Sequence, residues 1–410
     1  MEAAFEFEES PAVLARERLV AFVDGVVSGL PLQRQRTNAG LYVRGLIEQG
    51  GRKSLQPTLF RLEETAARYE SMQQFLADSP WDPVEVIRAC AERVCAEIGV
   101  EAWVLDDTGF PKQGKRSPGV QRQYSGTLGK IGNCQIGVSV HAVGGRGTVP
   151  LGWALYLPEE WCRDAERRAR AKIPAEIMFK TKPELGVELI ERAAGWNVPA
   201  APVLGDQAYG DNTQLRDRLN DAGSEYVLSI GAASKMFARE SVFAVPKQVA
   251  ATGRPKSRVL PDREPETVGE LIARVAATDS RIVAFRDGPD GESTESWFVF
   301  VRVRAAHGWQ HAQAPRREEW LIAEWPLGRP EPTDYWISNL PPDTEPERLA
   351  RLARMRWKIE LDYKQLKGEL GLDHYEGRSY AGWHHHTALV TVAHGYLTLE
   401  RLHPKAQRLT

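Results

Sequence analysis

The sequence predicts an α/β protein in which helices cover a mixed β-sheet, and three observations support this class. Residues 1 to about 95 place apolar side chains three and four positions apart, which is the spacing of one helix face. After Glu101, three runs rich in apolar and β-branched residues follow one another, and helical and strand-like runs then alternate. From Gly231 to Pro342, further strand-like runs lie between Pro and Gly turns, which predicts a β-rich insertion.

The totals describe an ordinary soluble protein of two or three compact units. The chain has 410 residues, of which 42% are hydrophobic and 26% charged, and no window approaches the ~20 apolar residues of a membrane-spanning helix. Its acidic start, MEAAFEFEES, lacks the basic and apolar regions of a signal peptide, so we expect a cytoplasmic protein. The spacing of Cys90, Cys95, Cys134 and Cys162 matches neither a metal site nor a disulfide framework, so we expect reduced core residues.

The N-terminal segment, residues 1–97, is predicted to be a helical DNA-binding domain. Ser79-Pro80 and Asp82-Pro83 interrupt its helical pattern. Five basic residues make up a candidate DNA-facing surface: Arg34, Arg36, Arg44, Arg52 and Lys53. The alternative interpretation of these five residues is a solvated helical face without a ligand.

Residues 98–231 are predicted to form the first part of the sheet. The run GVEAWVLDDTG is a predicted buried strand that ends in Asp106 and Asp107, and a glycine-rich basic loop follows it. CQIGVSVHAV and VPLGWALYLP form a predicted hairpin through GGRGT. We then expect a helix over 183–196, a strand that ends at Asp206, a helix in NTQLRDRLNDAG and a strand in EYVLSI.

The β-rich insertion is assigned to residues 232–342. Its strand-like runs are RIVAFRDG, ESWFVFVRVRA, EEWLIAEW and DYWISNL, and a polar stretch near 247–266 is a predicted loop. Residues 343–410 are predicted to complete the sheet region with two helices. The first of them runs from 348 to 372, and the second is a closing amphipathic helix in YEGRSYAGWHHHTALVTVAHGYLTLERL.

The helix over 348–372 presents a carboxylate among cations. Its apolar residues recur at helical spacing, and Arg356, Glu360, Lys364 and Lys367 fall together on the shoulder of that apolar stripe. Such a Glu can be fixed beside a core and still reach a ligand. The alternative is a face of helical-spacing salt bridges, each of which contributes about 0.2–0.5 kcal/mol.

Charge is unevenly distributed along the chain. The formal net charge of −2 argues against a nucleic-acid partner, because Lys and Arg dominate phosphate binding. However, residues 348–367 hold seven basic residues against two acidic ones, and residues 112–130 hold no acidic residue. The second segment contributes Lys112, Lys115, Arg116, Arg122 and Lys130. Two local positive patches are therefore predicted on a nearly neutral protein.

Three acidic positions lie at the ends of apolar elements. They are Asp106 or Asp107, then Asp206, and finally Glu360. Carboxylate oxygens suit Mg²⁺, and a pair of such ions about 3.5–4 Å apart supports in-line phosphoryl transfer. Spacing alone does not show that these acids meet.

Three motifs in this order resemble those of bacterial insertion-sequence transposases of the DDE type. The motifs are DDTGFPKQGKRSPGVQRQYSGTLGKIGNCQIGVSV, VLGDQAYGD and RWKIELDYKQLKGELGLDHYEGR. The chain is most similar to the insertion sequence 701 branch of the insertion sequence 4 superfamily, over roughly residues 100–400. In the last motif Arg356, Glu360 and Lys367 keep the spacing of that superfamily, whereas Ala353 stands at its tyrosine position. The resemblance therefore does not carry over a hairpin-forming step that depends on this tyrosine.

The resemblance implies an RNase H-like core and a DNA transposase. It implies cleavage at the ends of a mobile element and joining of the 3′ hydroxyls to target DNA, with Asp106, Asp206 and Glu360 holding two Mg²⁺ ions, for which Mn²⁺ can substitute. Asp107 is the alternative first acid, since adjacent strand residues face opposite ways. Phosphate contacts are assigned to Lys112, Lys115, Arg116, Arg122, Lys130, Arg356, Lys364 and Lys367. The implied partners are double-stranded DNA with terminal inverted repeats, target DNA and a second copy of the chain on DNA, and the implied location is the nucleoid of a bacterial cytoplasm.

Alternative functions remain open at the sequence level. One is a DNA-binding regulator derived from a transposase, and another is an RNase H-like nuclease that cuts without joining. Asp107-Thr108-Gly109 matches an aspartic-protease string, but a second copy of this string is absent from the sequence. The glycines of GTLGKIG fit a flexible DNA-contacting loop better than a P-loop, because Ile131 stands where Ser or Thr is needed.

Two groups of side chains can be interpreted either as structural or as functional. His384, His385 and His386 point in different directions on a helix, so zinc is disfavoured, and we expect some of them to face the core and one to face DNA or solvent. One of Trp320, Trp325 and Trp336 is a candidate for stacking on an unpaired base, while the remaining insertion tryptophans are expected in the core.

Overall fold

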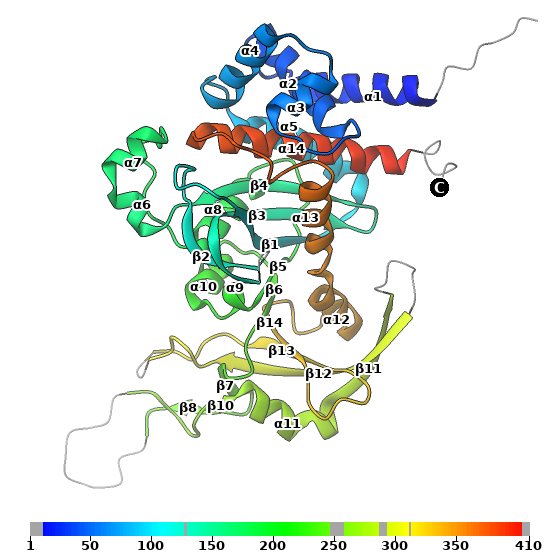
Figure 1. Cartoon of the computed structure of the whole chain (residues 1–410). Helices are drawn as coiled ribbons and strands as arrows, with labels where there is room; N and C mark the ends of the chain where they lie inside the picture. The colour runs from blue at the N-terminus through cyan, green and yellow to red at the C-terminus, as the bar shows by residue number, and fades with distance from the viewer. Residues whose placement is uncertain (1–10, 127–128, 247–257, 287–292, 311–312, 404–410) are drawn as a thin grey trace, which may run out of the picture. The chain divides into compact units, whose positions relative to one another are not determined.

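The computed structural model describes residues 11–126, 129–246, 258–286, 293–310 and 313–403 (Figure 1). The chain forms two compact units. Unit 1 comprises Met1–Glu101, Asp106–Ala200 and Lys358–Thr410, and unit 2 comprises Ala102–Leu105 and Ala201–Trp357. Both units are mixed α/β structures in which helices flank sheet strands, as the sequence predicts.

Unit 1 begins with five helices. They are α1 (Pro11–Val26), α2 (Gln33–Ile47), α3 (Leu55–Arg61), α4 (Ala66–Ala77) and α5 (Pro83–Ile98). Helix α5 starts where the sequence indicates, because the Asp82 side chain accepts a hydrogen bond from the Val84 backbone N–H at 2.8 Å and Pro83 occupies the first turn. It ends at Gly99, whose φ of 64° is in the left-handed region. The N-terminal segment is therefore helical.

The strands of unit 1 are arranged around the long strand β3 (Lys130–Gly144). They are β1 (Val100–Pro111), β2 (Gln121–Ser125), β3 (Lys130–Gly144) and β4 (Thr148–Tyr156). Strand β3 pairs antiparallel with β4, which confirms the predicted hairpin, and its first residues pair antiparallel with β2. The predicted loop between β1 and β3 therefore contains a strand, which sequence analysis missed because QRQYS lacks an apolar alternation. Thr127 and Leu128 of the predicted GTLGKIG loop lie outside the described residues.

Strand β1 is longer than the sequence predicts. It continues past Asp106 and Asp107 to Pro111, and the side chains of Thr108 and Phe110 are buried. The expectation that the two aspartates end the strand is wrong, because the polar DDT string continues in extended conformation beside β3. Asp106 therefore lies inside a strand.

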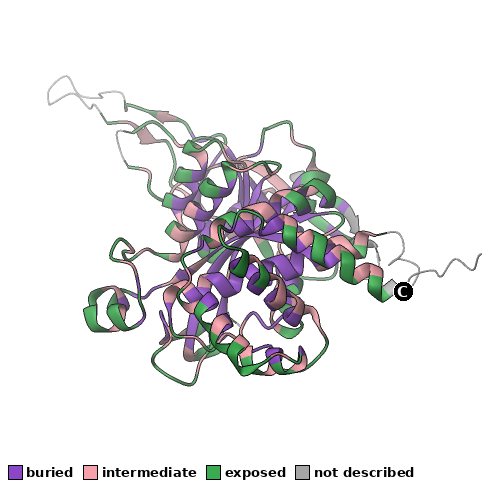
Figure 2. Ribbon diagram, turned by 90° about the horizontal axis from the view of Figure 1, so that it is seen from above, coloured by how far each residue is buried: buried purple, intermediate pink, exposed green. Residues whose placement is uncertain are grey.

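Helix α14 (Tyr380–Leu402) runs through the core of unit 1 (red in Figure 1). It contacts α5, α2 and α4 and also β4, and residues 385–396 are all buried. The predicted closing helix is thus confirmed, but its amphipathic character is wrong, because both of its faces are covered. Buried residues, purple in Figure 2, fill the strands and the inward helix faces. The remaining helices of unit 1 are α6 (Glu159–Arg163), α7 (Ala165–Arg170), α8 (Lys182–Ala194) and α13 (Lys358–Gly368).

Unit 2 contains a sheet with the strand order β10-β7-β12-β13-β14-β6-β5. Strand β5 (Val203–Gly205) is parallel both to β6 (Tyr226–Ser229) and to residues 103–105 of β1, while the other pairings are antiparallel. The further strands are β7 (Lys235–Ala238), β8 (Phe243–Ala244), β9 (Leu260–Pro261), β10 (Glu266–Thr267), β11 (Ser280–Arg286), β12 (Ser293–Ala305), β13 (Glu319–Trp325) and β14 (Asp334–Ser338). The four strand-like runs of the insertion are confirmed as β11 to β14.

The described residues of unit 2 include four helices. They are α9 (Gln207–Gly210), α10 (Thr213–Asp221), α11 (Val268–Asp279) and α12 (Pro346–Met355). The sequence did not predict α11, which starts with reciprocal hydrogen bonds between Thr267 and Glu270. Residues 247–257 of the predicted polar loop lie outside the described residues.

The predicted helix over 348–372 is in fact two helices. Helix α12 ends at Met355, Arg356 and Trp357 form a turn, and α13 begins at Lys358. Each helix buries apolar residues in a different unit, α12 in unit 2 and α13 in unit 1. Periodicity alone could not reveal this break, because the two apolar stripes follow almost the same helical arc.

Two expectations about composition can be compared with the structure. Cys90, Cys95 and Cys134 are buried free thiols and Cys162 is a partly buried one, which confirms that the cysteines are unpaired. Across the described helices, none is long and apolar enough to cross a membrane.

Candidate active site

The first two predicted acids follow paired residues of neighbouring strands. Leu105 of β1 pairs with Gly205 of β5 in parallel register, and Asp106 and Asp206 are the next residues of the two strands' chains. Asp106 is 8% exposed, and its Oδ1 accepts the Asp107 backbone N–H at 2.7 Å. Asp206 is the N-cap of α9, where its Oδ1 accepts backbone N–H groups of Ala208 and Tyr209 at 2.9 and 3.3 Å. Both carboxylates are thus held by backbone donors.

Asp107, the alternative first acid, is engaged elsewhere. Its Oδ2 forms an ion pair with Lys182 Nζ at 2.8 Å, at the start of α8. Its side chain is 19% exposed, so the pair is partly screened from solvent. The two adjacent aspartates therefore differ in environment, as the alternation of strand side chains requires.

Glu360 lies in the first turn of α13 and is exposed. The opposite side of this helix is anchored by Asp362, a residue that sequence analysis did not single out. Asp362 Oδ2 lies 2.8 Å from His141 Nδ1 on β3, and Thr148 on β4 donates a hydrogen bond to Oδ1. Helix α13 is therefore fixed to the β3–β4 hairpin by a buried polar network.

Asp362 is ionised inside the core. Burial alone would raise the pKa of Asp362, but hydrogen bonds from His141 and Thr148 and the nearby His394 outweigh it, so this pKa lies below its usual value. Burial lowers the pKa of His394 to about 4, so that imidazole is neutral at pH 7. No sequence pattern could have revealed this acid, since its partners come from three elements far away in the chain.

Tyr363 connects α13 to the neighbourhood of Asp106. Its hydroxyl lies 2.8 Å from Ser139 Oγ on β3. Burial raises the pKa of Tyr363 well above its usual value, and the negative charge of Asp106 raises it further. Asp106 is therefore close enough to Tyr363, on the helix that carries Glu360, for its charge to affect the tyrosine.

Lys367 is a predicted phosphate-binding residue that contacts the Asp-Asp-Thr-Gly string. Its Nζ donates to Thr108 Oγ1 at 2.7 Å and to the Gly109 carbonyl at 2.8 Å. Burial lowers the pKa of Lys367 to about 8, and the charge of Asp373 partly opposes this shift. The Lys367 ammonium thus contacts Thr108, which is two residues after Asp106 on the strand.

The other predicted DNA contacts differ in exposure. Lys112 is partly buried, donates to the Tyr375 carbonyl at 2.7 Å and has a pKa lowered by burial. Five residues are exposed, namely Lys115, Arg116, Arg122, Lys130 and Lys364, and Arg356 is partly buried in the turn before α13.

The N-terminal basic surface is largely engaged by the protein itself. Arg36 donates to Gln33, and Arg44 pairs with Glu48 at 2.7 Å. Arg52 pairs with Glu376, and Lys53 is buried, with its ammonium bonded to the Glu48 carbonyl. These contacts favour a structural role for most of the five residues.

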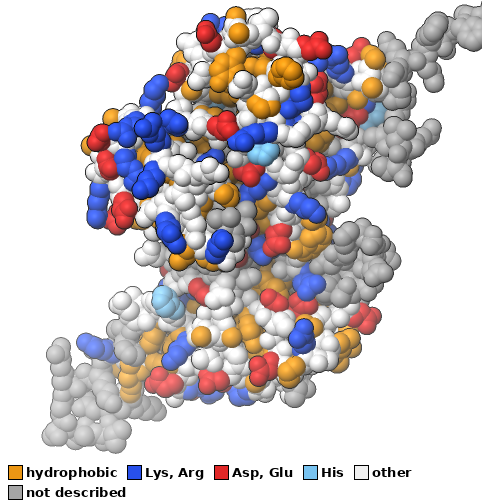
Figure 3. Space-filling view, in the orientation of Figure 1, with side chains coloured by type: hydrophobic (Ala, Val, Ile, Leu, Met, Phe, Trp, Pro, Cys, Tyr) orange, Lys and Arg blue, Asp and Glu red, His pale blue; other side chains and the backbone are white. Residues whose placement is uncertain are grey.

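A second gathering of Lys and Arg lies over α6 and α7 (Figure 3). Its members also have protein partners. Arg163 pairs with Glu159 and Arg170 pairs with Glu166, while the Arg167 guanidinium stacks 3.8 Å from the Trp161 ring centroid. Helical-spacing ion pairs and a cation–π contact account for this cluster without a ligand.

The histidines and tryptophans singled out in the sequence have structural partners. His384 contacts the Tyr380 carbonyl, His385 contacts two backbone carbonyls, and His386 contacts Tyr42 and the Leu372 carbonyl. Trp336 is buried, and the indole N–H groups of Trp320 and Trp325 donate to backbone carbonyls. Core packing of the histidines therefore prevails over zinc binding.

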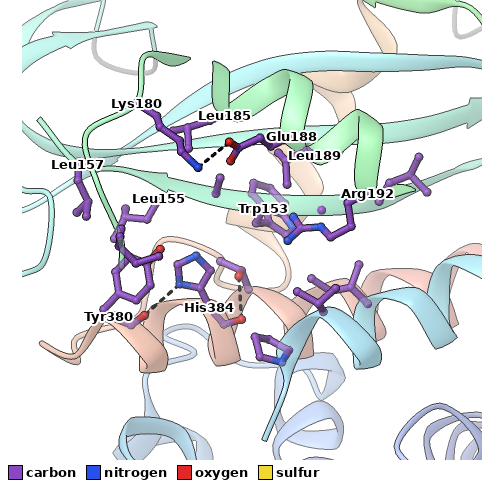
Figure 4. Close-up of a pocket in the computed structure, with 18 of the residues that line it drawn as sticks. Trp153, Leu155, Leu157, Lys180, Leu185, Glu188, Leu189, Arg192, Tyr380 and His384 are labelled. Carbon is purple, nitrogen blue, oxygen red and sulfur yellow. Dashed lines mark hydrogen bonds and ion pairs between the residues drawn. The ribbon is translucent and has the colours of Figure 1, made fainter. Parts of the chain in front are cut away.

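A cavity of about 210 Å³ lies between β4, α8 and α14 (Figure 4). Trp153, Arg192 and His384 line it, and Lys180 pairs with Glu188 at 2.6 Å at its side. None of the predicted acids lines this cavity. It is therefore separate from the candidate active site.

Carboxylates are the right ligands for Mg²⁺, but they are not gathered into a closed cluster. Over the described ranges, no group of three or more His, Cys, Asp or Glu side chains is close enough to hold a metal ion. Mg²⁺ commonly needs only one or two carboxylates, because waters and substrate phosphates complete its coordination. The donor chemistry of the three acids fits this mode of binding.

Comparison with known proteins identifies the family. A model of the family described as DDE superfamily endonuclease matches residues 26–291. The chain belongs to this family. This chain is also 24% identical over 315 residues to a probable transposase for insertion sequence element IS701 from Microchaete diplosiphon, a match that covers 75% of this chain and 69% of that protein. The predicted resemblance to insertion-sequence transposases is thus confirmed.

A solved structure is also similar to this DDE superfamily endonuclease. It is piggyBac transposase in a synaptic complex with hairpin DNA, with a TM-score of 0.44 and 9% sequence identity. The match covers 96% of this chain and 74% of that one.

Proposed function

We propose that this protein is a DNA transposase that cleaves the ends of a mobile element and joins the freed 3′ hydroxyls to target DNA. The proposed catalytic carboxylates are Asp106, Asp206 and Glu360. Membership in the DDE superfamily endonuclease family supports a nuclease or transposase activity. The observation that carries the assignment is the parallel pairing of Leu105 with Gly205, after which Asp106 comes next within β1 and Asp206 comes directly after β5.

Asp106 is favoured over Asp107 as the first acid. The charge of Asp107 is paired with that of Lys182, and although both aspartates raise the pKa of Tyr363, three residues after Glu360 on α13, Asp106 has the larger effect. The Asp107–Lys182 pair has a positioning role, because it fixes the strand segment that carries both aspartates.

The proposed reaction needs no energy source beyond the phosphodiester bonds. In cleavage, water attacks a phosphorus at the element end, the P–O3′ bond breaks, and a 3′ hydroxyl and a 5′ phosphate result. In joining, that hydroxyl attacks a target phosphorus and the target O3′ leaves. Two Mg²⁺ ions held by Asp106, Asp206 and Glu360 would neutralise the developing charge in both steps. Lys367 adds a fixed positive charge beside the Asp106 strand, suited to a non-bridging phosphate oxygen.

The remaining assignments follow from the same proposal. The core is RNase H-like and comprises residues 98–231 and 343–410, residues 232–342 are an insertion, and residues 1–97 bind DNA. The partners are inverted-repeat DNA and target DNA, with two copies of the chain on the DNA, in the nucleoid of a bacterial cytoplasm.

The test uses DNA duplexes taken from the sequences that flank the coding sequence, where the ends of the mobile element meet the surrounding DNA. Cleavage of these duplexes is measured. Asp206→Asn and Glu360→Gln are expected to cut more slowly than wild type in Mg²⁺ by about 10³-fold or more, as for other catalytic groups that act as a unit. Asp221→Asn and Glu369→Gln are matched controls at exposed acids and should cut at the wild-type rate. EDTA should abolish cutting, and added MnCl₂ should restore it.

Two results would count against the proposal. Wild-type rates for both Asp206→Asn and Glu360→Gln would remove these acids from the chemistry. Cleavage without transfer of the labelled 3′ end to a plasmid target would leave a nuclease in place of a transposase.

A further inference from the structure

The β2–β3 hairpin of unit 1 exposes a pair of large apolar side chains. Tyr124 on β2 is 64% exposed and Ile131 on β3 is 59% exposed. The two residues are direct cross-strand partners, so their side chains lie next to each other on one face of the hairpin. Adjacent large apolar side chains that are exposed to solvent often mark a surface that binds a ligand or another macromolecule.

Basic residues lie on and around this face. Arg122 lies two positions before Tyr124 on β2, which puts both side chains on one face, and it is exposed. Lys130, next to Ile131 on β3, is exposed as well, but its side chain lies on the opposite face of the hairpin. Asn133, the cross-strand partner of Arg122, donates from Nδ2 to the carbonyls of Lys112 and Gly114 at 2.6 and 3.0 Å.

Those bonds hold the loop after β1 against the hairpin. The next two residues of that loop, Lys115 and Arg116, are exposed. The stretch from Thr108 to Pro158 contains no Asp or Glu, so no acid of this stretch offsets the four cations around Tyr124. The chemistry of this surface therefore favours a polyanion with flat apolar parts.

The base of the hairpin is held firmly by its own contacts. Gln123 Nε2 donates to the Cys134 carbonyl at 3.0 Å, and Ser125 is buried. The Trp161 indole donates to the Val120 carbonyl at 2.8 Å just before β2. A side chain on such an anchored strand pair is positioned before a ligand arrives, which lowers the entropic cost of binding.

We propose that Tyr124, supported by Ile131, stacks on a DNA base that is exposed where the duplex is locally opened, while Arg122, Lys115 and Arg116 bind the flanking phosphates. This inference rests on the proposed function for the identity of the polyanion. An aromatic ring among cations is the arrangement that binds unstacked nucleotides, because the ring contacts the base and the cations contact the backbone. A matched duplex offers only its phosphates to this surface.

The experiment compares three fluorescein-labelled DNA probes in EDTA, so that no cleavage occurs. The probes are a matched duplex, the same duplex with a two-nucleotide bulge, and a single strand of thymidines. Wild-type protein should prefer the bulged and single-stranded probes. Tyr124→Ala should weaken binding to these two by about 5- to 150-fold, the range for loss of one base–aromatic stack, and leave the matched duplex nearly unchanged.

Control variants separate stacking from charge and folding. Tyr124→Phe should keep the wild-type preference, since the ring remains. Arg122→Ala should weaken all three probes by a similar factor, because a phosphate contact carries no information about base exposure. Leu327→Ala removes another exposed apolar side chain, in unit 2, and should change none of the affinities.

The outcomes distinguish this inference from the proposed function. Equal loss of affinity for all probes in Tyr124→Ala, or no loss at all, would overturn the stacking role. Substitution of Asp206 could still abolish cutting in that case, and the proposed function would stand. Failure of wild-type protein to bind any of the three probes would overturn the stacking role, while the cleavage assay on flanking DNA would still decide the proposed function.

Discussion

Lys367 carries a charge that burial makes sensitive to pH. Because burial lowers its pKa to about 8, the ammonium is mostly protonated at pH 7 and loses its proton as the pH rises through 8. Its contacts with Thr108 Oγ1 and the Gly109 carbonyl keep it near the Asp106 strand in either state. A phosphate bound there would therefore lose a charged partner at alkaline pH.

DNA affinity is expected to fall by about tenfold or more as the pH rises from about 7 to about 9, since a hydrogen bond to a charged group contributes ~1.5–3 kcal/mol. Lys367→Arg should flatten this pH profile, because a guanidinium stays protonated throughout the range. Fluorescence anisotropy of a labelled duplex at each pH measures the effect. Parallel profiles for wild type and Lys367→Arg would rule out this role for the Lys367 proton.

The sequence could identify residues whose spacing matches a known motif. It could not identify residues whose role depends on contacts that form only in the folded chain. Arg356, Glu360 and Lys367 could be singled out because their intervals match a known motif. Asp362 could not, since an acid two positions from Glu360 resembles any solvated helix residue until His141 and Thr148 are folded against it. Tyr124 was missed for a related reason, because QRQYS was assigned to a loop and exposure cannot be read from a loop.

At the scale of elements, helix α14 shows why a helical period does not fix the environment of a helix. Its apolar and histidine residues are buried on both sides, between the N-terminal helices and β4. The same limit explains the break between α12 and α13, where one continuous stripe serves two cores. Strands β3, β4 and β11 to β14 were predictable, because apolar and β-branched runs bounded by turns have few other interpretations.

Helix α14 also makes the protein sensitive to acid. Burial lowers the pKa values of His384, His386 and His394 to about 4, against 6.5 in an unfolded chain. Between these values the unfolded state binds more protons than the folded state, so the free energy of unfolding falls as the pH falls from about 6.5 to about 4. Above about pH 6.5 this stabilisation is fully present.

Three such groups give a slope of up to about 4 kcal/mol per pH unit near pH 5, from 1.36 kcal/mol per group. Chemical denaturation at several pH values measures the slope. His384→Gln should reduce it by about one third, because one titrating ring is removed while the glutamine can still donate to the Tyr380 carbonyl. A Tm that is independent of pH between 6.5 and 4.5 would show that these rings are not buried in the neutral form.

At the scale of the whole molecule, a formal net charge of −2 is reconciled with a nucleic-acid ligand by the way the charges are distributed. Arg163 and Arg170 of α6 and α7 are paired with Glu159 and Glu166. By contrast, the hairpin surface, formed by the cations around Tyr124, lies in a stretch of sequence without any acid. A neutral protein with one such surface binds DNA through a small number of phosphates, so the salt dependence of its affinity should be modest and traceable to individual residues.

The salt dependence gives a test that does not depend on any assignment of catalytic residues. Replacement of Lys115 and Arg116 by alanine is expected to reduce the slope of log K against log[salt] by about 2, because each phosphate contact contributes roughly 0.9. Arg163→Ala and Arg170→Ala together remove the same charge from α6 and α7 and should leave the slope unchanged, since both cations already have carboxylate partners. Equal slopes for the two double variants would mean that DNA senses only the total charge, and the hairpin surface would then have no special role in binding.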